Sequence, residues 1–374
     1  MAEDLQFDDE TQRILHRFGF DESTFGALRD RLRRQEGVDN VVRGQVAPPA
    51  EEDVVPLPPP GDPDRTRLTE RGRAAMARGE VGLVILAGGM ATRFGGVVKA
   101  GVPVVDGRSF LELKLQDAAR AAEDAGGRLP VYLMSSFATD EALRELAEEV
   151  APPGLEVEVF PQFVSVRLTE DASVFRGDDG RPSLYAPGHG DLPFALQRAG
   201  ILDRFQRAGG KVLFMSNVDN VTATADPAVV GAHLEGGARI TVEVAPKAPG
   251  DRGGAPARID GDPQIVETFR FPPDFDQDAI PVFNTNTMLF DVEVLESDRP
   301  LTWFRVTKKV DGQPVIQFER LVGELTAFWT TRFLRIARTG DDARFQPVKD
   351  PAELEARTDE IARALRSRGL LPRA

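Results

Sequence analysis

Short apolar runs alternate with amphipathic segments along the middle of the chain. The runs span residues 81–87, 128–136, 155–162 and 211–219. Their apolar residues are mostly continuous, which predicts strands buried on both faces, as in a parallel sheet. Other segments repeat apolar residues every three or four positions, and these predicted helices span residues 110–125, 140–150 and 193–208. This alternation is typical of an α/β fold in which helices flank a mostly parallel sheet.

Three later segments also have the composition of strands. They are rich in β-branched and aromatic residues and span residues 238–247, 263–271 and 281–292. We expect them to be β-rich additions that line one end of the sheet. The predicted architecture is therefore a mixed sheet, mostly parallel, flanked by helices.

The two ends of the chain differ from this middle part. Residues 8–36 have helical spacing, whereas residues 48–63 contain seven prolines in sixteen positions, which predicts an extended connector. A short helix over 69–79 leads into the first strand. We therefore predict three parts, which are an N-terminal helical segment with its Pro-rich connector, a main α/β domain and a C-terminal helix, over residues 1–66, 67–350 and 351–374.

Composition narrows the classes of function. The net charge of −14 argues against nucleic acid or an anionic membrane as the main partner. Thiol nucleophiles and thiolate metal sites are excluded because there is no cysteine, and three histidines argue against a multi-histidine metal centre. The N-terminus lacks an apolar segment and no run approaches 18 apolar residues. We expect a cytoplasmic protein that does not enter membranes.

The stretch VGLVILAGGMATRFGGVVKAG, residues 81–101, joins the first strand to a glycine-rich loop. Ligands bind at the carboxyl ends of strands in open α/β sheets, and paired glycines let the backbone approach a ligand closely. Arg93 and Lys99 supply positive charge suited to the phosphates of a nucleotide. Neither the P-loop pattern nor G-x-G-x-x-G is present. An ordinary glycine-rich turn with a solvated arginine and lysine remains the alternative.

Five short motifs resemble those of one enzyme family, in the family's order. GGMATRFG followed by Lys99 resembles the N-terminal motif of UDP-sugar pyrophosphorylases, although Ala91 replaces a glycine and Val98 replaces a proline. The other four are similar to motifs of the UTP–glucose-1-phosphate uridylyltransferase branch, and they are APGHGD (186–191), MSNVDN (215–220), FNTNTMLF (283–290) and RFQPVKD (344–350). The resemblance implies a GT-A-like, Rossmann-related nucleotidyltransferase fold, with residues 67–350 as its catalytic domain. The chain ends in a helix rather than the β-helix of eukaryotic members, so no oligomeric state is implied.

The reaction implied by the resemblance joins UTP and glucose 1-phosphate into UDP-glucose and pyrophosphate. The residues implied to bind the nucleotide are Leu86, Ala87, Gly88, Gly89, Gln162 and Gly188, of which Gln162 pairs with the uracil edge. Those implied for the sugar phosphate are His189, Asn217, Glu267, Asn284 and Asn286. The implied catalytic cations are Arg93, Lys99 and Lys349, and Asp219 is implied to hold Mg²⁺.

Taken without the family, several of these residues have ordinary alternatives. Gln162 could be a surface glutamine at a strand end, and Asp219 with Asn220 could form an Asx turn. Asn284 and Asn286 alternate along a predicted strand and therefore share one face. A non-catalytic nucleotide-sugar-binding protein stays open as another class of function. Within the enzymes, ARGEVGLVILAGG resembles UDP-N-acetylglucosamine pyrophosphorylases, but the HGD and NTN segments favour glucose.

Overall fold

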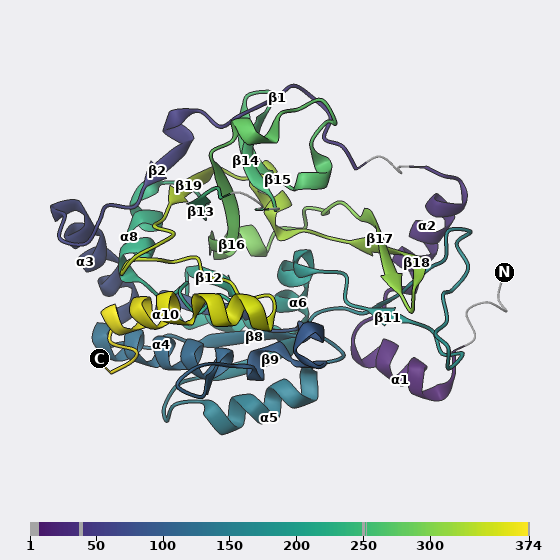
Figure 1. Ribbon diagram of the computed structural model, residues 1–374, viewed down its shortest axis with the longest axis horizontal. Coiled ribbons are helices and arrows are strands. Elements are labelled where there is room, and N and C mark those ends of the chain that lie inside the picture. Colours follow the sequence, from purple (N-terminus) through teal and green to yellow (C-terminus); the bar gives the residue numbers. More distant parts are fainter. Residues whose placement is uncertain (1–6, 37–39, 249–250, 252, 373–374) are drawn as a thin grey trace.

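A computed structural model describes residues 7–36, 40–248, 251 and 253–372, and its centre is an eight-stranded sheet (Figure 1). In spatial order the strands are β2 (Val54–Pro56), β19 (Thr331–Arg335), β13 (Ile240–Pro246), β16 (Val282–Asp291), β12 (Val212–Asn217), β3 (Val81–Leu86), β8 (Val131–Ser135) and β9 (Val157–Pro161). All neighbouring strands are parallel except β16, which runs antiparallel to both β12 and β13. The predicted mostly parallel mixed sheet is confirmed.

Helices cover both faces of this sheet. Val81, Leu83 and Ile85 of β3 face one hydrophobic cluster, while Val84 faces the other, as the two-residue period of a strand requires. The first face is covered by α3 (Pro63–Ala77), α4 (Phe110–Ala125), α5 (Asp140–Val150), α8 (Pro227–Gly236) and α10 (Pro351–Ser367). The second is covered by α6 (Leu192–Arg198), α7 (Ile201–Arg207) and α9 (Val292–Leu295). Both faces are buried, which explains why the strand sequences are continuously apolar.

Two details of the predicted elements are wrong. The segments at 238–247 and 281–292 form β13 and β16, which lie inside the main sheet and not at one end of it. Only the segment at 263–271 contributes to a smaller sheet, made of β1 (Val46–Ala47), β14 (Ala255–Ile259) and β15 (Asp262–Val266). The single helix predicted over 193–208 is two helices, because Gly200 between them adopts a left-handed φ of 64°.

The N-terminal part packs against the rest of the chain. The helices α1 (Asp9–Arg17) and α2 (Glu22–Arg33) share a hydrophobic cluster with the segment after β9 and with the strand β18 (Gln313–Glu319), which pairs with β17 (Phe304–Val310). The predicted extended connector over 48–63 is only partly extended, because it contains a 3-10 turn at Glu51–Asp53 before β2, which forms an edge of the main sheet. The predicted boundary after residue 66 falls inside α3, because that helix already begins at Pro63. In the part of the chain that the structure describes, no helix has the length and apolar character needed to cross a membrane.

Candidate active site

The strands β3, β8 and β12 end together at one edge of the sheet. Leu86 is in register with Asn217 on one side and with Met134 on the other. The Val218 N–H donates a hydrogen bond of 3.1 Å to the Leu86 carbonyl. The loops that follow these strands therefore begin at neighbouring points, where open α/β sheets bind ligands. This edge brings together the predicted residues 86–89, Asn217 and Asp219.

The buried side-chain amide of Gln162 faces the backbone of Gly88, which carries no side chain, at the carboxyl ends of these strands. The Gln162 side chain is only 6% exposed, and its Oε1 has no hydrogen-bond partner among the described residues. A Cβ on Gly88 would lie 2.6 Å from Gln162 Nε2 and 3.0 Å from the Ser135 carbonyl carbon, so only glycine fits. The Ser136 Oγ donates to the Gly88 carbonyl at 2.8 Å and holds this backbone in place. A buried acceptor without a partner costs free energy unless a ligand supplies a donor. The alternative of a surface glutamine is wrong.

The glycine-rich turn at 188–191 presents a neutral histidine. Gly188 adopts a φ of 98°, a conformation that favours glycine. The Val322 N–H donates to His189 Nδ1 at 3.1 Å, which leaves the ring proton on Nε2. Burial lowers the pKa of His189 to about 4. His189 is therefore a neutral hydrogen-bond donor at physiological pH.

The asparagines of the predicted sugar side belong to adjacent strands. Asn286 Nδ2 donates to Asn217 Oδ1 at 2.9 Å, which links β16 to β12. The predicted regular alternation of Asn284 and Asn286 is wrong, because the β13–β16 register shifts there and Asn286 has a φ of 57°. Instead, the Asn286 N–H donates to Asn284 Oδ1 at 2.9 Å. The bulge therefore places Asn286 between the two other asparagines, with its backbone bonded to the Asn284 side chain and its own side chain bonded to Asn217.

Gly254 connects Asn284 with Glu267. The Asn284 N–H donates to the Gly254 carbonyl at 2.8 Å. A Cβ on Gly254 would lie 2.7 Å from Glu267 Oε1, so this carboxyl packs directly on the glycine. Burial raises the pKa of Glu267 above its usual value. Four of the predicted sugar-side residues, Asn217, Asn284, Asn286 and Glu267, thus form a connected polar wall where β12 ends and β16 begins.

Two residues predicted for different roles form an ion pair. Lys99 Nζ pairs with Asp219 Oδ2, and the two side chains are 18% and 15% exposed. The described residues contain no group of three His, Asp or Glu side chains that could hold a metal. Mg²⁺ often binds proteins through one or two carboxylates, with substrate phosphates and water as its other ligands. A single Asp219 fits Mg²⁺ that arrives on a triphosphate, and not a metal held by protein ligands alone.

The other predicted cations lie at the exposed side of this pair. The Val348 N–H donates to the Asp219 carbonyl at 3.3 Å, which brings the closing segment and the exposed Lys349 to the site. The Arg93 side chain is 64% exposed and lies 3.9 Å from Asp350. Lys99 and the backbone of Val348, next to Lys349, therefore both contact Asp219. Arg93 lies near Asp350, the residue that follows Lys349.

Sequence reasoning missed a buried lysine beneath the site. Lys114 Nζ donates to Ser216 Oγ and to the Ala223 carbonyl, each at 2.7 Å, and so supports the loop that carries Asp219. Burial lowers the pKa of Lys114 to about 8. The sequence did contain a sign that this lysine is buried. Lys114 lies on the apolar face of its helix, three positions after Leu111 and four after Phe110.

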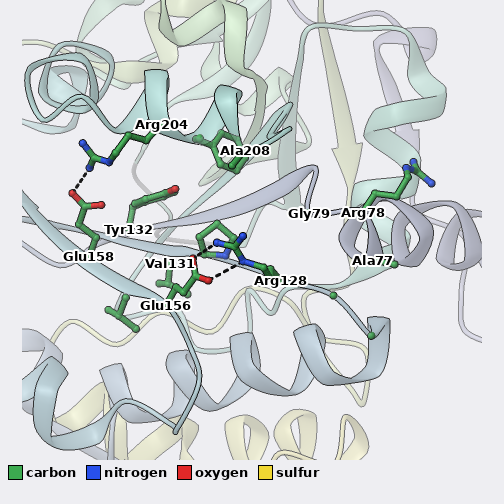
Figure 2. A pocket seen from close by; sticks show the side chains of 15 residues that line it. Ala77, Arg78, Gly79, Arg128, Val131, Tyr132, Glu156, Glu158, Arg204 and Ala208 are labelled. Carbon is green, nitrogen blue, oxygen red and sulfur yellow. Dashed lines mark hydrogen bonds and ion pairs between the residues drawn. The ribbon is translucent and has the colours of Figure 1, made fainter.

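A large cavity lies elsewhere in the described part of the chain. Figure 2 shows this cavity of about 750 Å³, which lies where β8 and β9 begin, at the opposite edge of the sheet. None of the predicted site residues line it. Its Arg128 pairs with Glu156 and its Arg204 with Glu158. Because these opposite charges already satisfy each other, the cavity offers no unpaired group comparable to Gln162.

Comparisons with known proteins agree with this geometry. The family model described as UTP–glucose-1-phosphate uridylyltransferase matches residues 23–362. The chain is similar to the UTP–glucose-1-phosphate uridylyltransferase of Musa acuminata, at 28% identity over 83% of this chain and 68% of that protein. The enzyme of the same name from Pyrus pyrifolia is 27% identical over 85% and 69% of the two chains.

Solved structures confirm the fold. A variant of UDP-glucose pyrophosphorylase from Leishmania major superimposes with a TM-score of 0.71 at 21% identity, over 95% of this chain and 79% of that one. The UDP-N-acetylglucosamine pyrophosphorylase of Trypanosoma brucei has the same TM-score at 22% identity, over 92% and 75% of the two chains. The fold is thus shared by both branches and does not separate their sugars. Because the family model covers most of the sequence, this chain belongs to the UTP–glucose-1-phosphate uridylyltransferase family.

Proposed function

We propose that the protein transfers the uridylyl group of UTP to glucose 1-phosphate, which forms UDP-glucose and releases pyrophosphate. The observation that carries the proposal is the unpartnered Gln162 Oε1 beside the bare backbone of Gly88. Uracil presents an N–H between two carbonyls, and a glutamine amide offers the complementary acceptor and donor. A base bound there would satisfy the buried amide, in a chain whose family uses UTP.

The chemistry needs positioning and charge more than covalent help. An oxygen of the sugar phosphate attacks the α-phosphorus of UTP, one P–O bond forms, and the bond to the leaving pyrophosphate breaks. Negative charge develops on the phosphate oxygens, where Lys99, Arg93 and Lys349 can offset it. Mg²⁺, when bound, supplies further electrostatic stabilisation, and Asp219 would hold it. An incoming triphosphate competes with Asp219 for the Lys99 ammonium, so the ion pair keeps both groups at the site until substrate binds.

The sugar-side residues are suited to a neutral sugar with one phosphate. Asn217, Asn284 and Asn286 offer amide donors and acceptors for hydroxyl groups. His189 Nε2–H is a neutral donor that can bind a hydroxyl or a phosphate oxygen without a change of protonation. Glu267 is an acceptor for a sugar hydroxyl at the far end of this wall.

A matrix of substrates tests the proposal. Purified protein with Mg²⁺ is given UTP, CTP, ATP or GTP together with glucose 1-phosphate or N-acetylglucosamine 1-phosphate, and pyrophosphate release is measured. We expect the highest kcat/KM for UTP with glucose 1-phosphate. A preference for the N-acetylated sugar would assign the protein to the other branch, and equal rates with ATP would contradict the uracil site. Binding of UDP-glucose without any turnover would identify a non-catalytic binder.

A further inference from the structure

The segment after β18 is tied to the glycine-rich turn through its backbone. The Arg320 N–H donates to the Pro187 carbonyl and the Gly190 N–H donates to the Arg320 carbonyl, both at 2.9 Å. A Cβ on Gly190 would lie 2.3 Å from the Arg320 carbonyl carbon, so no side chain fits between the two segments. The Val322 N–H holds His189, as described above. The turn that presents Gly188 and His189 is thus fixed by the residues that follow the β17–β18 hairpin, which lies outside the main sheet.

The side chains of Asp191 and Arg320 extend this link to the base-binding amide. Asp191 is fully buried, and its Oδ1 accepts a hydrogen bond of 2.9 Å from Arg320 Nε. Its Oδ2 accepts the Phe163 N–H at 3.1 Å. Phe163 directly follows Gln162, so one carboxylate holds both the arginine and the peptide next to the uracil-binding residue. The pair joins residues 129 positions apart.

Aromatic rings confine the arginine. The Arg320 guanidinium carbon lies 4.3 Å from the ring centres of Phe194 and Trp303 and 5.7 Å from that of Phe163. The side chain is 11% exposed. A planar guanidinium can stack on rings and donate from its edge to a carboxylate at the same time, which lysine cannot do. The guanidinium therefore has one defined position, and so does Asp191.

We infer that Asp191 and Arg320 are positioning residues for nucleotide selectivity. They place the Gln162 amide and the Gly188 turn on either side of the base, without touching it themselves. The inference rests on the proposed function, because it assumes that Gln162 binds uracil. A purely structural tie would lower stability when weakened, but it would leave the preference for uracil unchanged.

The test uses Asp191→Asn and Arg320→Lys in the full-length protein. Asp191→Asn keeps the shape and an acceptor for the Phe163 N–H, and Arg320→Lys keeps the charge but loses the stacked, forked contact. We measure kcat and KM with UTP and with CTP, together with the melting temperature. The KM for UTP should rise about tenfold or more, since small displacements of binding groups cost up to about 10²-fold. The kcat with UTP should change less than about threefold, and the UTP preference over CTP should fall about tenfold.

Two further variants keep the test decisive. Trp303→Leu removes one ring beside Arg320 without changing a charge, and it should shift the KM and the base preference in the same direction by a smaller factor. Trp303→Leu therefore tests the positioning role even if Asp191→Asn does not fold. Arg204→Lys makes the same arginine-to-lysine substitution in an exposed ion pair with Glu158, where β9 begins (Figure 2), and should leave every parameter near wild type.

The outcomes separate this inference from the proposed function. If the wild-type protein transfers no uridylyl group, the proposed function fails, whatever the variants do. If the wild type is active and the variants lose melting temperature only, with an unchanged UTP-to-CTP ratio, the positioning role is overturned. A large loss of kcat at constant KM would also overturn it, because the pair would then act on the chemical step.

Discussion

The base side and the phosphate side of the site differ in how firmly the protein holds them. On the base side, Gln162 and Asp191 are almost fully buried, and the surrounding backbone is fixed by hydrogen bonds within the protein. On the phosphate side, Arg93 and Lys349 are exposed, and Arg93 forms a long ion pair with Asp350. We therefore propose that the base side is prepared before binding, whereas Arg93 and Lys349 would become ordered when a triphosphate supplies their counter-charge.

The Lys99–Asp219 pair lies between the two sides. The pair is mostly buried, like the residues of the base side, but it consists of two charged groups, like those of the phosphate side. Each group cancels the charge of the other while the site is empty of phosphate. This arrangement avoids an unpaired buried charge and still keeps a cation and a carboxylate available for the proposed chemistry. The pair is therefore the place where the difference between the sides can be tested most strongly.

The largest effect is expected from Lys99→Ala and Asp219→Ala. Both groups act on charge that develops in the transition state, so kcat should fall by ~10²–10³ while the KM for UTP changes far less. Activity should also disappear with EDTA and return with excess Mg²⁺. Steady-state kinetics of both variants measure this.

Arg13→Ala is the control for these two variants. Arg13 lies on α1, where its exposed side chain donates from Nε to the Asp9 carbonyl, and its loss should change little. Near-normal kcat in Asp219→Ala would contradict the role in metal binding. The same result in Lys99→Ala would mean that another cation of the site offsets the charge on pyrophosphate.

The sequence predicted elements well wherever the cause was local. The helix over 140–150 has the predicted bounds, because its apolar face repeats with helical spacing and both flanks lack it. The motifs predicted Lys99, Asp219 and Lys349 for one site, and the structure pairs Lys99 with Asp219 and brings Val348, next to Lys349, to the same loop. The central position of β16 could not be predicted, because the order of strands depends on contacts between distant segments. Side chains alternate with a period of two in edge strands and in central strands alike, so this pattern does not show where in a sheet a strand lies.

Other features depended on partners that no local pattern specifies. The hairpin of β17 and β18 was not predicted, since only the first residue of β17, with the sequence FRVTKKV, is buried. Its importance comes from Arg320, which meets Asp191 only in the folded chain. The bulge at Asn286 was also missed, because asparagine tolerates positive φ without any change in the apolar pattern.

A second prediction tests the base side through Gly88→Ala. The added Cβ would lie 2.6 Å from Gln162 Nε2, so the amide or the backbone must move. We expect kcat/KM for UTP to fall about 10-fold to 10²-fold, mostly through KM. Gly101→Ala in the same loop is the matched control, since its Cβ would meet only Leu146 at an ordinary 3.5 Å. If Gly88→Ala and Gly101→Ala had equal kinetics, the site would tolerate a side chain at position 88.

A third prediction concerns the exposed cations. Charges in solvent are screened by salt, with a Debye length of about 8 Å at 0.15 M and about 3 Å at 1 M. The KM for UTP should therefore rise severalfold between low and high salt, at nearly constant kcat, because the buried Lys99–Asp219 pair is screened less. Arg93→Gln should weaken this dependence. A salt effect that falls on kcat instead would contradict the division between the two sides.

The smallest effect is expected from the titration of His189. The pKa of its imidazole in the folded protein is lowered to about 4, whereas the ordinary value is near 6.5. A proton therefore binds the unfolded chain more tightly, and stability is complete above pH 6.5 and falls as the pH decreases from 6.5 towards 4. Between pH 7.5 and 5.5 this group should lower the free energy of unfolding by about 1 kcal/mol, since its side chain keeps some exposure.

NMR can follow this titration because the chain has only three histidines. The signal lost in His189→Asn identifies the residue, and its chemical shift should stay constant down to about pH 5. Denaturation of the same variant at both pH values should show a smaller difference than the wild type, because asparagine can still accept the Val322 N–H without titrating. A His189 signal that titrates above pH 6 would mean that the imidazole is charged at the site and binds the sugar phosphate as a cation. The sugar side would then share the ionic character of the phosphate side.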